Sequence, residues 1–292
     1  MSLASKVMNA LVSPPRVADQ GRLRRAVSGK CVLVTGASYG LGEATARKLA
    51  AAGATVLLVA RSADKLDELR DSISADGGRA VAFPTDLTDA AAITALTTQL
   101  TETYGPLDII VSNAAKSIRR SLKLQYDRPH DFERTIDTNY LGPIRLLLGL
   151  LPAMQERGSG HVVNVSSIGV RMMPTPRWGT YLASKGAFDL WLRSVTPELR
   201  AVGIDVTSVY MGLIHTRMSE PTPSLRRMPG MQPDEAADVV AKAIIHRPRK
   251  VQPRWTLPGE LASVLLAPVL ERGAGLVYRH SEDSDRARNV YR

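Results

Sequence analysis

Tyr181 and Lys185 lie four residues apart in the stretch TYLASKGAFDLWLRSVTPELRAVG, whose apolar pattern predicts one long helix. Side chains at this spacing share one face of a helix, so the phenol and the ammonium group are expected to be neighbours. A free phenol has a pKa of about 10 and is a poor base at neutral pH, whereas a nearby positive charge lowers that pKa. Unless the two form an ordinary surface pair, Tyr181 is a candidate for exchanging a proton with an alcohol or carbonyl group.

A glycine-rich stretch, VTGASYGLG at residues 34–42, has the spacing G-x-x-x-G-x-G. It follows the apolar run CVLVTG and opens the helical pattern GEATARKLAAAG. Gly36 allows the chain to turn sharply, and Gly40 and Gly42 leave room for a pyrophosphate beside the backbone amides of the helix N-terminus. A plain strand-to-helix turn is the alternative, but the strand–loop–helix context favours nucleotide binding.

Arg61 indicates which nucleotide is bound. It follows the second apolar run, TVLLVA, at the strand end near which the adenosine ribose of a dinucleotide lies. An acidic side chain there accepts hydrogen bonds from a free 2′-hydroxyl, whereas a guanidinium pairs with a 2′-phosphate. We therefore expect NADP(H) to be preferred over NAD(H), against the alternative that Arg61 is a solvated residue at the start of a helix.

The elements that must position these residues alternate along the chain. Six short apolar runs are typical of buried strands: CVLVTG, TVLLVA, RAVAFPTDL, LDIIVSNAA, GHVVNVSS and IDVTSVYMG. The stretches between them predict helices, including a long one from roughly Asp131 to Leu151. Strands that are apolar almost throughout need cover on both faces. The fold class is therefore α/β: a single Rossmann-type, doubly wound parallel sheet with helices on both faces and a C-terminal helical appendage.

The same pattern predicts how the chain is divided. We expect a basic N-terminal extension at residues 1–28 and one nucleotide-binding domain at residues 29–256. That domain includes a substrate lid at about residues 217–232. An amphipathic segment with a basic tail follows at residues 257–292.

The charge of the chain is concentrated at its two ends. Residues 1–30 carry six Lys or Arg and one acid, and residues 244–292 carry nine Lys or Arg and five acids, within a net charge of +10. Basic ends on a nearly neutral core suit an anionic surface such as a membrane face, or are simply solvated tails. The neutral core and an aromatic content of 5% argue against a nucleic-acid binder.

Cys31 is the single cysteine, so a disulfide framework is excluded and a reducing cytosol fits. Cys31 itself is expected to be a small buried hydrophobe. No apolar run approaches the roughly 20 residues of a membrane-spanning helix. We expect a cytoplasmic protein without a metal site, either soluble or peripheral at the inner membrane face.

Six motifs occur in order along roughly residues 29–245: TGASYGLG, DL, SNAA, TNYLG, VVNVSS and YLASK. Over this range the chain resembles the short-chain dehydrogenase/reductase family. The resemblance implies an oxidoreductase in which Tyr181 exchanges the proton and Lys185 also holds the nicotinamide ribose. Ser167 is expected to hydrogen-bond the substrate oxygen and stabilise its developing charge, with Ser166 left open as an alternative.

The resemblance also implies the remaining site residues. Asn139, in TNYLG, is expected to hold a water that joins Lys185 to solvent, Asp86 to accept from the adenine amino group, and Thr216 to contact the nicotinamide carboxamide. The family usually has proline where Met211 stands, so the loop that carries Thr216 is expected to differ here. The cofactor-binding positions are Gly36, Ser38, Tyr39, Gly40, Leu41, Gly42, Arg61, Asp86, Leu87, Asn113, Ala114, Tyr181, Lys185 and Thr216.

The lid sequence RMSEPTPSLRRMPGMQPDEAA contains four prolines and three methionines. Methionines adapt to long apolar ligands, and Arg226 and Arg227 could meet a phosphate or carboxylate, with a plain solvated lid as the alternative. The later stretch LPGELASVLLAPVLERGAGLVYRH is amphipathic and suits a cap over the substrate, a dimer surface or a lipid interface. Together with the helix PDEAADVVAKAI, these segments resemble the reductase domain of bacterial fatty acyl reductases and related lipid ketoreductases.

We therefore expect an NADPH-dependent reductase that converts a carbonyl of a hydrophobic substrate to an alcohol, the substrate being a long-chain acyl group, a keto-lipid or a fatty aldehyde. A hydroxysteroid or xenobiotic carbonyl dehydrogenase is the alternative within this class, and a non-catalytic NADPH-binding sensor is the alternative outside it. The family pairs subunits through the helices that hold Asn139 and Tyr181, so a homodimer or homotetramer is expected.

Overall fold

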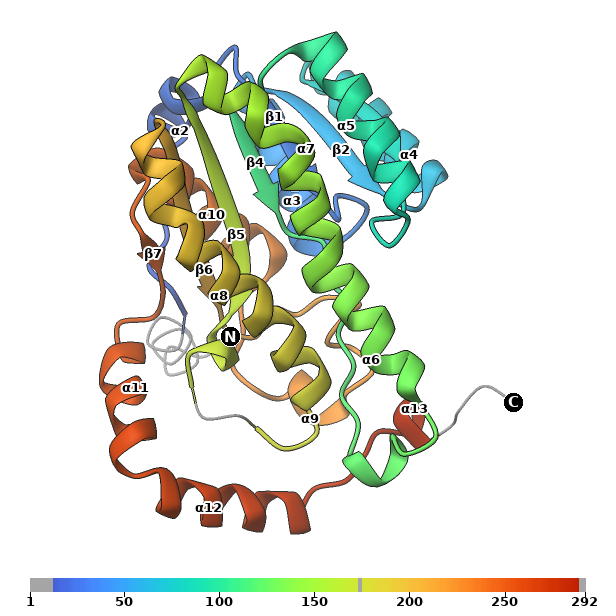
Figure 1. Cartoon of the computed structure of the whole chain (residues 1–292), viewed down its shortest axis with the longest axis vertical. Helices are drawn as coiled ribbons and strands as arrows, with labels where there is room; N and C mark the ends of the chain where they lie inside the picture. Colours follow the sequence, from blue (N-terminus) through green and yellow to red (C-terminus); the bar gives the residue numbers. More distant parts are fainter. Residues whose placement is uncertain (1–12, 173–174, 289–292) are drawn as a thin grey trace.

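Seven parallel strands form one sheet in the computed structural model, which describes residues 13–172 and 175–288 (Figure 1). The strand order is β3-β2-β1-β4-β5-β6-β7, so the order reverses between β1 and β4. The strands are β1 Cys31–Thr35, β2 Thr55–Ala60, β3 Arg79–Pro84, β4 Ile109–Ser112, β5 Gly160–Ser167, β6 Ile204–Met211 and β7 Lys250–Val251. The predicted doubly wound parallel sheet is confirmed. The sequence analysis missed β7 because two residues are too short for a pattern.

Helices cover both faces of the sheet because its strands are apolar on both sides. In β1, Val32 and Val34 belong to one buried cluster and Leu33 belongs to the other. The first face packs against α2 Gln20–Val27, α3 Gly40–Ala51, α4 Ala63–Ala75 and α10 Pro233–His246. The second face packs against α5 Ala90–Tyr104, α7 Gly142–Arg157 and α8 Gly179–Ala201.

Cys31, the first residue of β1, is half-buried. Burial raises the pKa of its thiol to about 11, so the thiol stays protonated and unreactive at neutral pH. Cys31 therefore contributes to packing, as the sequence indicates.

The predicted helix from Asp131 to Leu151 is not one regular helix. α6 spans Pro129–Ile136, a π-helical turn spans Asp137–Leu141, and α7 follows at once. Close packing accompanies the break, because a Cβ on Gly142 would lie 2.3 Å from the carbonyl oxygen of Leu87. Single π turns inside helices often occur at functional sites, and this one holds Asn139.

The predicted N-terminal extension is described only in part, since residues 1–12 lie outside the described residues. Its helix α2 packs against α3 and α10, with Leu23 and Val27 buried. Arg16 also forms an ion pair of 2.6 Å with Glu235 at the start of α10. The described part of the extension is therefore attached to the sheet domain.

The C-terminal appendage consists of α11 Thr256–Leu265, α12 Ala267–Arg279 and α13 Asp285–Arg288. Figure 1 shows α11 and α12 as an angled arm along the end of the molecule that also carries α9 Pro223–Arg226 and α13. Over residues 13–172 and 175–288, no single helix has the length and hydropathy of a membrane-crossing segment. α11 and α12 reach that composition only as a pair, and they are bent by 99° relative to each other.

Candidate active site

Three of the predicted site segments meet at the carboxyl edge of the sheet, where the strand order reverses. Thr35 ends β1, Asn113 follows β4, and Ser167 ends β5. β4 is paired with β1 on one side and with β5 on the other. Ligands of doubly wound folds bind outside this edge at the change in strand order. The topology therefore brings the glycine loop and the predicted catalytic residues to one place.

The glycine loop packs tightly against the chain that follows β4. Gly36 has a φ of 67°, and a Cβ there would lie 2.8 Å from the Cα of Ala114. A Cβ on Gly42 would lie 2.1 Å from the carbonyl oxygen of Gly36, so this glycine lets α3 approach the loop. Glycine at position 42 is therefore needed for packing within the loop, and the approach of a pyrophosphate to Gly42 stays a prediction. The side-chain amide of Asn113 donates to the Thr35 carbonyl at 2.9 Å and ties β4 to the loop.

The first turn of α3 fits an anionic group. Gly40 begins the helix with a φ of 58°, and a Cβ there would lie 2.9 Å from the Thr216 methyl group. Tyr39 occupies the N-cap position without a side-chain hydrogen bond to the helix, so no capping side chain satisfies the first amides. Such a helix N-terminus binds phosphates readily. Leu41 is buried and Ser38 is partly exposed beside it.

Thr216 lies in the turn after β6, where its amide donates to the Ser219 hydroxyl at 3.1 Å. Met211, in place of the family's usual proline, is 4% exposed and pairs with Ser167 in the ladder between β5 and β6. The strand therefore continues through this position before the chain turns toward the glycine loop. The structure places Thr216 against Gly40, and its contact with the nicotinamide stays a prediction.

Arg61, Asp86 and Lys116 are close enough to interact electrostatically beyond the end of β2. An Arg61 nitrogen lies 3.9 Å from an Asp86 carboxylate oxygen, and the Arg61 side chain is 71% exposed. The other Asp86 oxygen accepts hydrogen bonds from the Thr88 amide and hydroxyl, both at 2.9 Å. Burial lowers the pKa of Lys116, and the positive charges of Arg134 and Arg61 lower it further. Lys116 was missed by the sequence analysis because it stands one residue beyond the SNAA motif.

Tyr181 and Ser167 are brought together at the end of β5. Burial raises the pKa of the Tyr181 phenol, and a hydrogen bond with Ser167 lowers it by a smaller amount. The Ser167 hydroxyl also accepts from the Gly169 amide at 3.3 Å. By contrast, the Ser166 hydroxyl is buried and finds no hydrogen-bond partner among the residues that the structure describes. The geometry therefore favours Ser167 over Ser166 as the partner of Tyr181.

Lys185 is buried on the same face of α8 as Tyr181. Its ammonium group donates to the Val165 carbonyl at 2.9 Å, and burial lowers its pKa to about 8. The expectation that this ammonium lowers the pKa of Tyr181 stays a prediction, because another effect decides the net direction of the pKa shift here. Burial is the larger effect, and it raises the phenol pKa above its ordinary value. Both groups are thereby shifted toward their neutral forms.

Asn139 uses its whole carboxamide to connect two neighbouring segments. Its nitrogen donates to the Lys116 carbonyl at 2.8 Å and to the Ser184 hydroxyl at 2.9 Å, and its oxygen accepts from the Lys116 amide at 2.7 Å. The π turn therefore joins the chain after β4 to α8, one residue before Lys185. The water that Asn139 is expected to hold stays a prediction.

A buried polar network below Lys185 was missed by the sequence analysis. Asp189, one helical turn after Lys185, is 1% exposed and accepts from the Tyr210 hydroxyl at 3.0 Å. Asn164 donates to the same carboxylate at 3.5 Å, and an Arg193 nitrogen lies 3.8 Å away. The negative charge of Asp189 raises the pKa of Lys185 against the effect of burial.

Two arginines of the predicted lid make contacts that the structure describes. The Arg226 guanidinium donates to the Glu220 carbonyl at 3.1 and 3.2 Å, so it closes the lid on itself. Contact of Arg226 or Arg227 with a substrate anion stays a prediction, and both residues are exposed. At the start of the lid, the Arg217 guanidinium lies 4.5 Å from the centre of the Tyr39 ring and covers the glycine loop.

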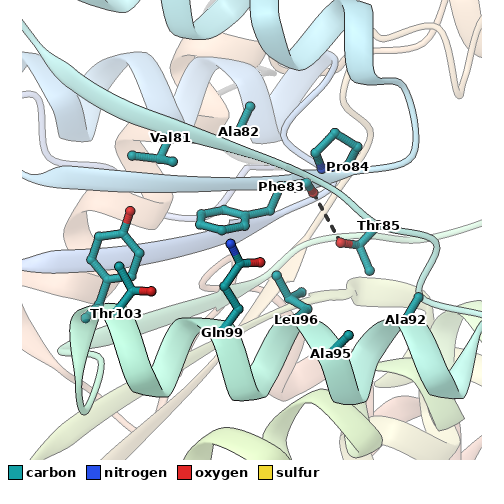
Figure 2. A pocket seen from close by; sticks show the side chains of 11 residues that line it. Val81, Ala82, Phe83, Pro84, Thr85, Ala92, Ala95, Leu96, Gln99 and Thr103 are labelled. Atoms are coloured by element: carbon teal, nitrogen blue, oxygen red, sulfur yellow. Dashed lines mark hydrogen bonds between the residues drawn. The ribbon is translucent and has the colours of Figure 1, made fainter.

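A groove of about 490 Å³ lies between the edge strand β3 and α5 (Figure 2). Phe83 and Thr85 line it from the strand side, and Leu96 and Gln99 line it from the helix. None of the predicted site residues lines this groove, so it is separate from the candidate site.

Among the described residues, no group of three or more His, Cys, Asp or Glu side chains is arranged to hold a metal ion.

The fold and site define a class of protein: a doubly wound nucleotide-binding oxidoreductase with a tyrosine, a lysine and a serine at the carboxyl edge of its sheet. The family model described as short chain dehydrogenase matches residues 30–226. The chain belongs to the short-chain dehydrogenase/reductase family, whose members are enzymes acting on CH–OH and C=O groups with a nicotinamide cofactor.

Among its relatives, the chain is similar to fatty acyl reductases. A fatty acyl-CoA reductase of Acinetobacter baylyi is 44% identical over 244 residues, which cover 84% of this chain and 81% of that protein. A fatty acyl-CoA reductase of Mycobacterium tuberculosis is 40% identical over 78% of each chain. A metagenomic short-chain oxidoreductase, solved in complex with NADP, is 32% identical with a TM-score of 0.66, over 76% of this chain and 93% of that chain.

We predict that Asp189→Asn lowers the pKa of Lys185 below about 8, because it removes the negative charge that raises that pKa. The amide oxygen still accepts the Tyr210 hydroxyl, so the fold is expected to persist. NMR titration of ¹³C-labelled lysine side chains measures the shift. Asp205→Asn removes an exposed carboxylate 3.1 Å from Arg247 and is the control that leaves Lys185 unchanged. Identical Lys185 titrations in the two variants would contradict this role of Asp189.

Proposed function

We propose that the protein reduces a carbonyl group of a hydrophobic substrate to an alcohol and prefers NADPH as its cofactor. The observation that carries this proposal is the position of Ser167 beside Tyr181, with the buried Lys185 one turn further along α8. These groups lie at the sheet edge that also carries the glycine loop. A non-catalytic sensor would need none of these three side chains for binding, so their arrangement favours catalysis.

The chain's own residues suggest how a proton is supplied. Ser167 and Tyr181 hold two hydroxyl groups side by side, which suits one substrate oxygen that accepts hydrogen bonds from both. When bound, the cofactor supplies the hydride that the carbonyl carbon receives. Tyr181 gives its phenolic proton to the carbonyl oxygen as the carbon–oxygen double bond becomes a single bond. A phenol held neutral by burial is suited to donate a proton, which agrees with the direction of reduction.

Lys185 has two roles in this proposal. Its ammonium group stabilises the phenolate that remains on Tyr181 after proton transfer, because an opposite charge nearby favours the ionised form. It also holds the ribose hydroxyls of the cofactor. Asp189 is the buried negative charge that favours the protonated form of Lys185 at neutral pH.

Two cations support the preference for NADPH. Arg61 is exposed at the end of β2 and is separated from Asp86 by 3.9 Å, which is too long for a strong ion pair. Its guanidinium is therefore available to a 2′-phosphate. Lys116 adds a second positive charge, and its pKa is lowered by burial and then by the positive charges of Arg134 and Arg61. A phosphate at this corner would relieve the repulsion among these cations.

A lipid substrate is supported by the relatives and by the predicted lid. Two relatives at 44% and 40% identity are fatty acyl-CoA reductases. Met218 and Met228 of the lid are 49% and 52% exposed, which leaves two adaptable side chains for a long apolar ligand, whereas Met231 is buried in the core. A hydroxysteroid or xenobiotic carbonyl compound is the alternative substrate class.

Pairing of subunits through α7 and α8 is also proposed. Leu148 and Leu190 on these helices are each 61% exposed.

Arg61→Ala is expected to weaken NADPH binding by about tenfold or more while NADH binding changes little, because only NADPH carries the 2′-phosphate. Quenching of intrinsic protein fluorescence measures both dissociation constants without turnover. Arg79→Ala changes an exposed arginine at the start of β3, at the opposite edge of the sheet from Arg61, and serves as the control. Unchanged NADPH affinity in Arg61→Ala would remove the argument for cofactor preference.

Tyr181→Phe is expected to lose at least about a hundredfold in carbonyl reduction while keeping its NADPH affinity, because it removes only the donated proton. NADPH oxidation is followed with fatty aldehydes, acyl thioesters, 3-keto lipids, steroid ketones and small polar ketones. Turnover restricted to small polar ketones would refute the lipid substrate. Retained turnover in Tyr181→Phe would refute the mechanism whatever the substrate.

A further inference from the structure

The helix α11 carries its polar side chains toward the protein and its large apolar side chains away from it. Glu260 forms a two-pronged ion pair with Arg171, at 2.9 and 2.7 Å, and Thr256 is fully buried. On the opposite side, four apolar residues are 56%, 60%, 76% and 77% exposed: Leu257, Leu261, Val264 and Leu265. A surface helix of a protein surrounded only by water shows the reverse arrangement.

The next helix, α12, is apolar on one side and basic on the adjoining side. Val269, Leu276 and Val277 are 61%, 55% and 60% exposed, and the structure buries no residue of this helix. Arg272 and Arg279 lie on the adjoining side, where they line a shallow groove of about 660 Å³. This arrangement is typical of helices that lie at the surface of a lipid bilayer. We call α11 and α12 together the strap.

The strap is attached to the protein at both of its ends. Arg171 holds α11 through Glu260, as described above. After α12, the Arg177 guanidinium donates to the hydroxyl and the carbonyl of Ser281, each at 2.6 Å, and lies 4.4 Å from the centre of the Tyr278 ring. The exposed apolar side of the strap is therefore held in place by the loop between Ser167 and Tyr181.

The apolar surface of the strap is too concentrated to be incidental. Eighteen large hydrophobic residues are exposed in the described chain, and ten of them lie between Trp255 and Tyr278. Soluble monomers rarely expose contiguous apolar patches of more than a few hundred Å². The strap is therefore expected to be covered by another apolar surface.

The charge around the strap favours lipid over a second copy of this chain as that surface. Arg254, Arg272 and Arg279 are exposed along it, whereas Glu260 is neutralised by its ion pair and Glu271 is the remaining acid. Two copies facing each other would bring like charges together, but an anionic bilayer attracts them. The 99° bend between α11 and α12 fits helices lying in the interface better than one straight span.

We propose that the strap docks the protein on the anionic surface of a lipid bilayer. Of the described N-terminal basic residues, Arg22, Arg24 and Arg25 belong to α2, which lies at the other end of the molecule from α12 (Figure 1). The proposed membrane contact uses the C-terminal of the two basic ends. Docking through the strap does not depend on the proposed reaction, although it would bring the loop beside Ser167 and Tyr181 to a source of apolar substrates.

The test is flotation of the purified full chain with vesicles of phosphatidylcholine alone and of phosphatidylcholine mixed with phosphatidylglycerol. The native protein is expected to float with the anionic vesicles and to be released by high salt. Leu261→Glu is expected to lose at least about tenfold in vesicle affinity, because it places a charge in the apolar contact. Leu122→Glu is the matched control, since Leu122 and Leu261 are 63% and 60% exposed, and it is expected to float like the native protein.

Three outcomes would overturn docking on lipid. The first is native protein that does not float with either vesicle, and the second is Leu261→Glu that floats like the native protein. The third is a native dimer that Leu261→Glu dissociates without any flotation, which would show that a second copy covers the strap. NADPH oxidation with a water-soluble aldehyde is measured in parallel. If the native and Leu261→Glu proteins oxidise NADPH equally in this assay, the loss of flotation is a failure of docking alone. It then says nothing against the proposed reaction.

Discussion

The candidate site depends on holding a half-buried phenol and a buried ammonium group on one face of α8. Burial disfavours charge on both, so it raises the pKa of Tyr181 and lowers the pKa of Lys185 to about 8. The protein offsets this effect with fixed polar partners: Ser167 hydrogen-bonds the phenol, the Val165 carbonyl accepts from the ammonium, and Asp189 supplies a negative charge. In the protein described here, the direction of the pKa shift favours the protonated phenol.

The fold supports this arrangement through contacts between segments that are far apart in the sequence. Asn139 joins the chain after β4 to Ser184 of α8, and Asn113 joins it to the end of β1. Close approach of backbone segments accompanies both contacts. Gly142, next to the π turn, lies against the Leu87 carbonyl, and Gly36 of the glycine loop lies against the Cα of Ala114. The edge of the sheet where β1, β4 and β5 end is therefore one connected structure, to which the strap is joined through Arg171 and Arg177.

Patterns that depend on local sequence predicted the fold and the centre of the site. The apolar strands and the helices between them follow from periodicity, and the pairing of Tyr181 with Lys185 follows from the geometry of a single helix. Features that depend on tertiary contacts were not predicted. Gly42 makes room for the Gly36 carbonyl, and Asp189 lies below Lys185, where β6 supplies the Tyr210 hydroxyl as its partner. The burial that decides the pKa of Tyr181 is also a property of the whole fold.

The most direct test of this account is the ionisation of Tyr181 with and without the oxidised cofactor. Ultraviolet difference titration near the tyrosinate band, taken as the native protein minus Tyr181→Phe, isolates this phenol from the other seven tyrosines. The account predicts a pKa above 10 in the free protein, because burial raises it, and a lower pKa when NADP⁺ adds a positive charge beside it. A free-protein pKa below 10, or one that NADP⁺ leaves unchanged, would contradict the account.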